Sequence, residues 1–193
     1  MSATPDRYFE ERWEDSDDPW DQVERFSEQR KYDLTVASLP RPRYRRAYEP
    51  GCAIGSLTRR LAGRVDHLLA SDRHERAVAA ARTACAGRPS VVVELHRLPD
   101  DWPDGRFDLV VLSEILYYFD PPTATRILGA ARASLEAGGH LVACHFRPEV
   151  PEHAVRGDEV HELIRALGWR PVVAHREPGF LLEVFEDGAT EAP

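Results

Sequence analysis

The sequence predicts an α/β protein built on a doubly wound, mostly parallel sheet of seven strands, with helices on both faces and the last strand antiparallel. Three stretches predict this class. An apolar run ends at Glu49 and is followed by the glycine turn at residues 51–55, and a second apolar run ends at Asp72. Residues 107–114 form a nearly unbroken apolar run, which is typical of a central parallel strand buried on both faces.

Strand-like and helix-like segments alternate along the chain, as a doubly wound sheet requires. We expect strands at residues 45–50, 67–72, 91–95, 107–114, 140–146, 170–176 and 179–186, the last two forming a hairpin. We expect helices at residues 21–38, 56–64, 75–85, 120–137 and 158–167. Asp120 should cap the fourth of these helices, with Pro121 in its first turn.

A single domain should span residues 1–193, with an N-terminal lid and helix in residues 1–40 and the sheet in residues 45–186. Residues 1–18 are polar and acidic, and we expect them to be mobile at their start. Pro40 and Pro42 should end the helix at 21–38. Its buried positions should include Val23, Phe26, Leu34 and Ala37.

Composition excludes several kinds of partner. The net charge of −8 and the pI of about 5.5 oppose binding to a nucleic-acid backbone. No apolar run is long enough to cross a membrane, and the acidic N-terminus does not resemble a signal peptide. The three cysteines have no metal-ligand spacing and leave one unpaired, which favours reduced thiols and a cytoplasmic location.

The glycine turn and Asp72 together predict a cofactor that carries a nucleoside. A turn without Cβ atoms lets a ligand approach the backbone, and a carboxylate about twenty residues later can accept hydrogen bonds from both ribose hydroxyls. The dinucleotide fingerprint G-x-G-x-x-G matches only at Gly51, because Ala53 and Ser56 occupy the other two positions. An ordinary strand-turn-helix without a ligand is the alternative for the turn taken alone.

The turn resembles E-x-G-x-G-x-G, the first motif of class I S-adenosylmethionine-dependent methyltransferases, with Ala53 in place of the middle glycine. The L-P and D-G loop at residues 98–105, the F-D-L-V strand at 107–110 and the Gly138-Gly139 pair follow in that family's order. A narrower resemblance, to the nodulation protein S family, spans nearly the whole chain. It is carried by residues 18–20, 28–32, 49–52, 112–114, 117–118, 157–158 and 160–161.

The resemblance implies a Rossmann-like fold, S-adenosyl-L-methionine as cofactor and a set of binding residues. Glu49, Gly51, Cys52 and Gly55 should face the methionine part of the cofactor. The remaining cofactor contacts would be Asp72 at the ribose, Arg73 beside the ribose or adenine, His96, Arg97 and Leu98 near adenine, and Ser113, Glu114 and Ile115 beneath the sulfonium. Adenine would be read by His96 or by a backbone carbonyl, since the usual acidic residue is missing there.

Trp20, Arg30 and Tyr32 form either a lid over the cofactor, with Arg30 reaching its carboxylate, or a simple docking surface for the first helix. Both interpretations are equally compatible with the sequence.

The expected chemistry is transfer of a methyl group from a sulfonium to a small-molecule acceptor, N- or O-methylation of an amino sugar or saccharide being the nearest precedent. The nodulation protein S family includes an enzyme that N-methylates the terminal glucosamine of a chito-oligosaccharide. An amine needs only to be neutral when it attacks, whereas an alcohol needs a base. His145 is the first candidate base, with Tyr118 and His161 as further catalytic candidates. Tyr117, Arg147 and Asp158 are candidate substrate contacts.

Two apparent motifs have simpler explanations. Asp120-Pro121-Pro122-Thr123 resembles the D-P-P-Y motif of enzymes that methylate amino groups of nucleic acids, but it lacks the aromatic residue that stacks on a flipped base. The histidines near residues 145–161 have no helical metal-ligand spacing, so we expect no metal.

Three other functions compete with a small-molecule methyltransferase of this kind. They are a cofactor-binding protein without catalysis, an O-methyltransferase of another secondary metabolite, and a nucleotide-sugar or NAD-dependent enzyme.

Overall fold

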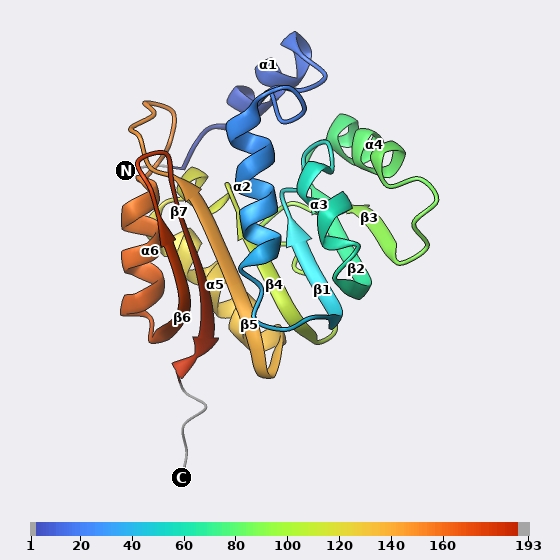
Figure 1. The fold of residues 1–193 in the computed structure, drawn as a ribbon. Helices are drawn as coiled ribbons and strands as arrows, with labels where there is room; N and C mark the ends of the chain where they lie inside the picture. Colours follow the sequence, from blue (N-terminus) through green and yellow to red (C-terminus); the bar gives the residue numbers. More distant parts are fainter. Residues whose placement is uncertain (1–2, 189–193) are drawn as a thin grey trace. The chain divides into compact units, whose positions relative to one another are not determined.

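The computed structural model describes residues 3–188, in which seven strands form one sheet in the order β3-β2-β1-β4-β5-β7-β6 (Figure 1). All strand pairs with a determined register are parallel except those that involve β7, which runs antiparallel to both β5 and β6. The predicted fold class, including the antiparallel last strand, is confirmed. The chain divides into two compact units: residues 5–97, and residues 98–188 together with residues 3–4.

The first unit holds three parallel strands and four helices. The strands are β1 (Tyr44–Pro50), β2 (Val65–Asp72) and β3 (Val91–Leu95). The helices are α1 (Asp6–Asp15), α2 (Phe26–Ala37), α3 (Ser56–Leu61) and α4 (Glu75–Ala84). Helix α4 packs on β2 and β3, α3 packs on β2, and α2 packs on α3.

The N-terminal segment differs from the prediction. Residues 6–15 form α1, a helix that the acidic composition concealed, and Phe9 and Trp13 bury one side of it at a spacing of four residues. We also predicted that this segment is mobile at its start. Residues 1 and 2, to which part of that prediction applies, lie outside the described residues.

Helix α2 begins five residues later than predicted, and the expected apolar face is wrong. Val23 and Phe26 are 57% and 79% exposed, Leu34 is half-buried and Ala37 is exposed. Polar contacts hold this helix against α3 instead: the Arg60 guanidinium donates to Asp33 at 2.6 Å and to Gln29 at 2.5 Å. Apolar spacing alone therefore identifies the wrong side of α2.

The second unit holds β4 (Phe107–Ser113), the 3-10 turn η1 (Leu116–Tyr118), α5 (Pro121–Ser134), β5 (Leu135–Phe146), α6 (Gly157–Ala166), β6 (Trp169–Arg176) and β7 (Phe180–Asp187). Every residue of β4 is buried, as its apolar run predicts. Asp120 caps α5 by accepting a hydrogen bond from the Thr123 amide at 2.9 Å, with Pro121 in the first turn, so this prediction is confirmed.

Two boundaries in the second unit shift. Helix α5 ends at Ser134, three residues before the predicted end, because β5 already pairs with β4 at Leu135. The Gly138-Gly139 pair therefore lies inside β5, next to an irregularity in its register with β4. Helix α6 packs against β5, β6 and β7, beside the C-terminal hairpin (Figure 1).

Gly55 is the position where the first unit most needs a glycine. Its φ of +81° lies in the left-handed region, and a Cβ there would come within 3.1 Å of the Ala81 Cα atom on α4. The small alanines of α4 and the bare Gly55 backbone thus allow the turn after β1 to lie directly against that helix.

We expect Gly55→Ala to destabilise the protein more than Gly87→Ala, a matched control. Gly87 has almost the same φ, +79°, but a Cβ there would have no neighbour within 4 Å. Both variants should lose ~1–2 kcal/mol through left-handed backbone strain, and Gly55→Ala a further ~1–3 kcal/mol through overpacking. Urea unfolding measures both; equal losses would show that the contact with α4 does not constrain this turn.

Candidate cofactor and acceptor sites

The turn after β1 is held by backbone hydrogen bonds. The Cys52 amide donates to the Ser71 carbonyl on β2 at 2.9 Å, and the Gly55 amide donates to the Cys52 carbonyl at 2.9 Å. Gly51, Ala53 and Gly55 all have positive φ, with Ala53 at +46°. A non-glycine residue in this conformation is uncommon and requires surrounding contacts that fix it.

Asp72, at the end of β2, supplies such a contact. Its Oδ2 accepts a hydrogen bond from the Ala53 amide at 3.0 Å, and its Oδ1 accepts one from the His74 amide at 3.0 Å. Burial raises the pKa of this carboxyl, against the lowering effect of these amides. Asp72 thus has a structural role that its predicted role as ribose acceptor did not include; each oxygen keeps a second lone pair for a ligand.

Glu49 lies one residue before the end of β1 and is 3% exposed. Burial raises its pKa to about 8, although the Thr58 hydroxyl partly opposes this. Its Oε2 is buried and finds no hydrogen-bond partner among residues 3–188. A buried, unsatisfied carboxylate oxygen is costly, so this atom is a candidate for direct contact with a ligand.

The Cys52 thiol lies near both carboxyl groups. Its pKa is raised by burial and then by the charges of Asp72 and Glu49. The turn is therefore flanked by two acidic groups within one unit. Such surroundings disfavour a phosphate and favour a ligand with a cationic part and hydroxyl groups.

The three lid candidates behave differently from one another. Trp20 packs on a cluster of Trp13, Ala53 and Ala77, and its indole Nε1 is buried without a hydrogen-bond partner among the described residues. Tyr32 is buried and donates to Glu28 at 3.3 Å, which fits the docking alternative. Arg30 is half-buried and engaged within the protein.

Arg73 does not lie free for a ribose. Its guanidinium pairs with Asp6 at 2.7 Å and lies 5.0 Å from the centre of the Phe9 ring, so it anchors α1. Two residues that the sequence analysis missed lie here as well: His74 stacks on Trp13, with ring centroids 5.3 Å apart. The spacing of Phe9 and Trp13 was the only indication of this contact in the sequence.

The three candidate residues after β3 have different surroundings. The Nε2 of His96 lies 3.2 Å from Glu94, while its Nδ1 is buried and has no partner among the described residues. The His96 amide donates to the Asp72 carbonyl at 3.0 Å. Arg97 is exposed and engaged within the protein, and Leu98 belongs to the second unit.

In the second unit, the turn after β4 brings several candidates together. Glu114 has a φ of +56°, and its Oε2 accepts a hydrogen bond from the Tyr117 hydroxyl at 2.6 Å. Burial and the nearby Glu114 raise the pKa of Tyr117 well above its ordinary value, so its phenol stays protonated. Ser113 is buried, with an Oγ that finds no partner in residues 3–188, and Ile115 is half-buried.

An aromatic group surrounds Tyr117. His153, which was not predicted as a site residue, stacks on the Tyr117 ring with centroids 3.9 Å apart. The Tyr118 ring meets the Tyr117 ring edge-on, with centroids 4.7 Å apart. Burial lowers the pKa of His153 to about 4, against the opposing charge of Glu152, so His153 is neutral at physiological pH.

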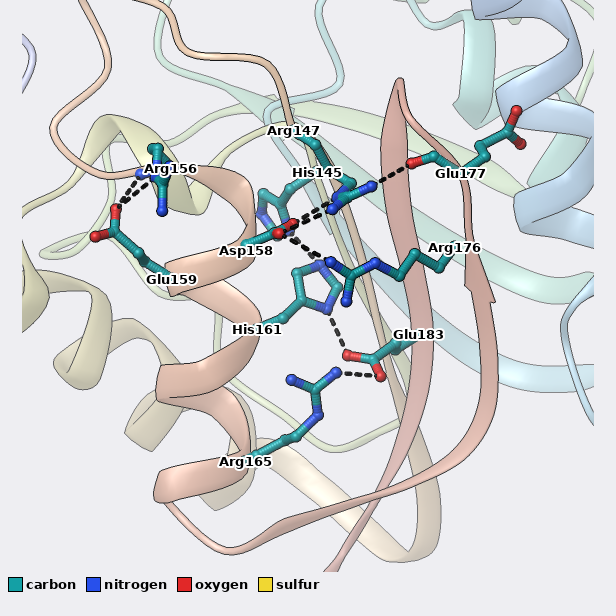
Figure 2. A network of polar contacts seen from close by, with 10 residues as sticks. All are labelled: His145, Arg147, Arg156, Asp158, Glu159, His161, Arg165, Arg176, Glu177 and Glu183. Atoms are coloured by element: carbon teal, nitrogen blue, oxygen red, sulfur yellow. Dashed lines mark hydrogen bonds and ion pairs between the residues drawn. The ribbon is translucent and has the colours of Figure 1, made fainter.

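His145 is fully buried and both of its ring nitrogens are engaged. Its Nε2 lies 3.3 Å from the Leu116 amide, and its Nδ1 lies 3.1 Å from Nε2 of His161. His161 is also fully buried, and its Nδ1 lies 2.7 Å from Glu183 (Figure 2). This geometry conflicts with the prediction that His145, or His161 in its place, takes the proton of the acceptor.

Arg147 and Asp158, predicted to contact the acceptor, pair with each other. The guanidinium donates to both oxygens of Asp158, at 2.6 and 3.0 Å, and to the Glu177 carbonyl at 2.7 Å (Figure 2). The hydrogen bond from Arg147 lowers the pKa of Asp158 despite its partial burial. An acceptor would have to share or displace this ion pair.

No three His, Cys, Asp or Glu side chains among residues 3–188 are grouped so that they could hold a metal ion. No helix within the same range is long and apolar enough to cross a membrane.

Comparison with known proteins supports the sequence resemblance. Residues 47–139 match the methyltransferase domain family. Nodulation protein S of Rhizobium tropici is 29% identical over 129 residues, which cover 66% of this chain and 54% of that protein. The chain thus matches about half the length of this curated relative.

This chain covers nearly the whole length of two solved structures. A candidate methyltransferase from Pseudomonas syringae is 41% identical, with 83% of this chain and 99% of that chain covered and a TM-score of 0.75. The N-methyltransferase NodS from Bradyrhizobium japonicum WM9, in complex with S-adenosyl-L-homocysteine, is 22% identical, with 94% and 99% covered and a TM-score of 0.84. The chain belongs to the class I S-adenosylmethionine-dependent methyltransferases and resembles nodulation protein S.

Proposed function

We propose that this protein transfers a methyl group from S-adenosyl-L-methionine to an amine of a small molecule, an amino sugar being the nearest precedent. The observation that carries the cofactor half of the proposal is the pair of carboxyl groups, buried Glu49 and half-buried Asp72, beside the turn at residues 51–55. The relatives named for nodulation suggest the acceptor half.

The two carboxyl groups match the polar ends of this cofactor. Asp72 has lone pairs left for the two ribose hydroxyls, and Glu49 has one oxygen without a partner among the described residues, which suits the α-ammonium of the methionine part. A pyrophosphate would meet two acidic groups there, which disfavours a nicotinamide dinucleotide.

The second unit favours an amine over an alcohol. An alcohol needs a base in the transition state, whereas an amine needs only to arrive neutral. His145 and His161 are buried with both ring nitrogens engaged, and the phenol of Tyr117 is held protonated. Of the candidates near the acceptor, Glu114 is the carboxylate that could take up the proton released after the amine has attacked.

We propose further that Tyr117, Tyr118 and Glu114 contact the acceptor amine. Aromatic faces and a carboxylate attract the positive charge that develops on the nitrogen as the neutral amine takes up the methyl group. Methyl transfer from a sulfonium has a good leaving group, so alignment and exclusion of water supply most of the acceleration.

A direct assay tests this proposal. The protein, S-adenosylmethionine and a chito-oligosaccharide with a free terminal amine should give a product with one added methyl group, detected by mass spectrometry. The fully N-acetylated oligosaccharide is the matched control and should not react. Methylation of the acetylated substrate alone would establish an O-methyltransferase, and tight cofactor binding without turnover on any amine would favour a binding protein.

We expect Asp72→Ala to weaken binding of S-adenosylhomocysteine by about 30- to 1000-fold, because two charge-assisted hydrogen bonds to the ribose are lost. The variant should also unfold more easily, by ~1–3 kcal/mol, because the Ala53 and His74 amides lose their acceptor. Calorimetry and urea unfolding measure the two effects.

Asp66→Ala is the control for Asp72→Ala, since Asp66 lies near the start of the same strand in an exposed ion pair with Arg43. It should bind S-adenosylhomocysteine like the wild type. Unchanged affinity in a folded Asp72→Ala protein, or tighter binding of NAD than of S-adenosylhomocysteine by the wild type, would overturn the cofactor assignment.

We expect the stability of the ligand-free wild type, relative to that of Glu49→Gln, to fall as the pH rises from about 5 to about 8. The folded-state pKa of Glu49, about 8, lies above the ordinary 4.5, so the folded protein retains a proton that the unfolded chain releases. The stability that Glu49 contributes is present below the ordinary pKa and is lost as the pH rises through about 8, up to a limit of ~5 kcal/mol.

Urea unfolding at a series of pH values measures this slope, with exposed Glu75→Gln as the control that should keep it. Parallel slopes for Glu49→Gln and wild type would show that Glu49 is ionised in the folded protein.

A further inference from the structure

A buried chain of three hydrogen bonds runs from the backbone of η1 to a carboxylate on β7. It begins at the Leu116 amide, passes through His145 on β5 and His161 on α6, and ends at Glu183, with contacts of 3.3, 3.1 and 2.7 Å. Both histidines are fully buried and Glu183 is 2% exposed. In Figure 2, His161 points from α6 toward Glu183, and Arg165 reaches the other oxygen of that carboxylate at 2.5 Å.

The hydrogens of this chain can be counted. The Leu116 amide can only donate, so Nε2 of His145 accepts, and the hydrogen of a neutral His145 lies on Nδ1. His145 therefore donates to Nε2 of His161, whose own hydrogen lies on Nδ1 and is donated to Glu183. Although burial alone would raise it, the pKa of Glu183 is lowered by the hydrogen bonds from His161 and Arg165, which keeps it an acceptor. Three contacts hold three hydrogens.

A fourth proton has no place in the chain. If it is added to either histidine while the contacts of the pair with each other and with Glu183 are kept, the hydrogens shift until Nε2 of His145 carries one, and that hydrogen then faces the Leu116 N–H. Two donors cannot share a hydrogen bond, so the bond to Leu116 breaks. The arrangement thus connects the charge of the two histidines to the backbone of η1.

We propose that His145 is a positioning residue, which holds the Leu116–Tyr118 turn through the Leu116 amide and releases it when the His145–His161 pair takes up one proton. Its effect on methyl transfer rests on the proposed function; the hold on the turn does not. The turn matters because it carries Tyr117, bonded to Glu114, and because the Tyr117 and Tyr118 carbonyls accept the Ala154 and Thr4 amides.

The charged and titratable groups around the pair come from four elements. Tyr117 on η1 meets His145 edge-on at 5.5 Å, and Asp158, on α6 like Arg165, interacts electrostatically with His161. Glu183 lies on β7, and Arg147, next to β5, neutralises Asp158. Glu183 is the carboxylate that contacts the pair directly, and it is itself shared with Arg165.

The backbone is shaped for this contact. A Cβ on Gly157, the first residue of α6, would overlap the Phe146 carbonyl oxygen and come within 3.1 Å of the His145 Cβ. The missing side chain lets α6 approach the end of β5 closely enough for His161 to reach His145.

The first test needs neither substrate nor mutation. Amide hydrogen exchange of the wild type, expressed as a protection factor, should show the Leu116 amide losing protection by about tenfold or more between about pH 8 and about pH 5. The amides of β4 follow any change in global stability over that range, so the protection of Leu116 is measured relative to theirs. A constant ratio of Leu116 protection to β4 protection from about pH 8 to about pH 5 would overturn the release of the turn.

Two substitutions separate the hold from the remaining functions of the ring. In His145→Gln, the side-chain Oε1 reaches the place of the histidine Nε2 and can accept the hydrogen bond from the Leu116 amide. Because this oxygen does not titrate, the protection of Leu116 should persist and lose its pH dependence. The amide of His145→Asn reaches the place of Nδ1 and keeps only the contact with His161. Its Leu116 protection should therefore be low, by about tenfold, at every pH.

His140→Gln is the matched control, because His140 is 4% exposed on the same strand and faces Glu186 on β7 at 3.5 Å. It should keep wild-type protection and its pH response. Equal protection in the Gln and Asn variants of His145, or an equal loss of protection in His140→Gln, would overturn the positioning role. If His145→Asn does not fold, the wild-type titration and His145→Gln still decide.

Turnover gives an independent readout once an acceptor is known. His145→Gln should keep kcat within about threefold of wild type, whereas His145→Asn should lose kcat with little change in the KM for S-adenosylmethionine. If His145 were a catalytic base, both variants would lose kcat equally, and an equal loss would overturn the proposal. If the protein methylates nothing, the exchange experiment still tests the hold on the turn.

Discussion

The carboxylate of Asp72 joins two pieces of backbone that would otherwise be independent: the Ala53 amide in the turn after β1 and the His74 amide before α4. Ala53 has an unfavourable positive φ, and Gly55 must lie against Ala81 of α4. Both conditions require the end of β2 and the turn after β1 to keep a fixed separation. The two hydrogen bonds to Asp72 supply that constraint, and the other candidate cofactor contacts of the first unit are built around it.

The same constraint has an electrostatic cost. Glu49 is buried and Asp72 is half-buried, both lie near Cys52, and loss of solvation raises the pKa of each. A stable core has no use for such a pair, since apolar residues of similar size would pack there without penalty. Destabilised acids beside a glycine turn are typical of a binding site, and their sign favours a ligand with a cationic part. The same two residues therefore affect both the stability of the fold and the proposed cofactor site.

The sequence predicts the sheet well because buried strands and glycine turns leave local patterns. The first strands, the hairpin and the Asp120 cap required only apolar runs, turn residues and a capping residue. Helices α1 and α2 were harder, since aromatic and ionic contacts rather than an apolar stripe hold them: Arg73 lies over Phe9, and Arg60 bonds to Asp33. The site residues divide in the same way, with Glu49 and Asp72 fixed by strand ends and Arg73 engaged by a helix the sequence concealed.

His145 shows why a position at a strand end does not determine a chemical role. The end of β5 is where this fold exposes catalytic groups, yet His161 from α6 and the Leu116 amide engage both nitrogens of the ring. Neither contact is visible in the sequence, because residues 116, 145 and 161 come together only through packing made possible by Gly157. An enzyme whose acceptor is an amine does not need His145 as a base, since a neutral amine supplies its own lone pair. What such an enzyme still requires is alignment, and a buried histidine that holds the turn beside Glu114 and Tyr117 provides it.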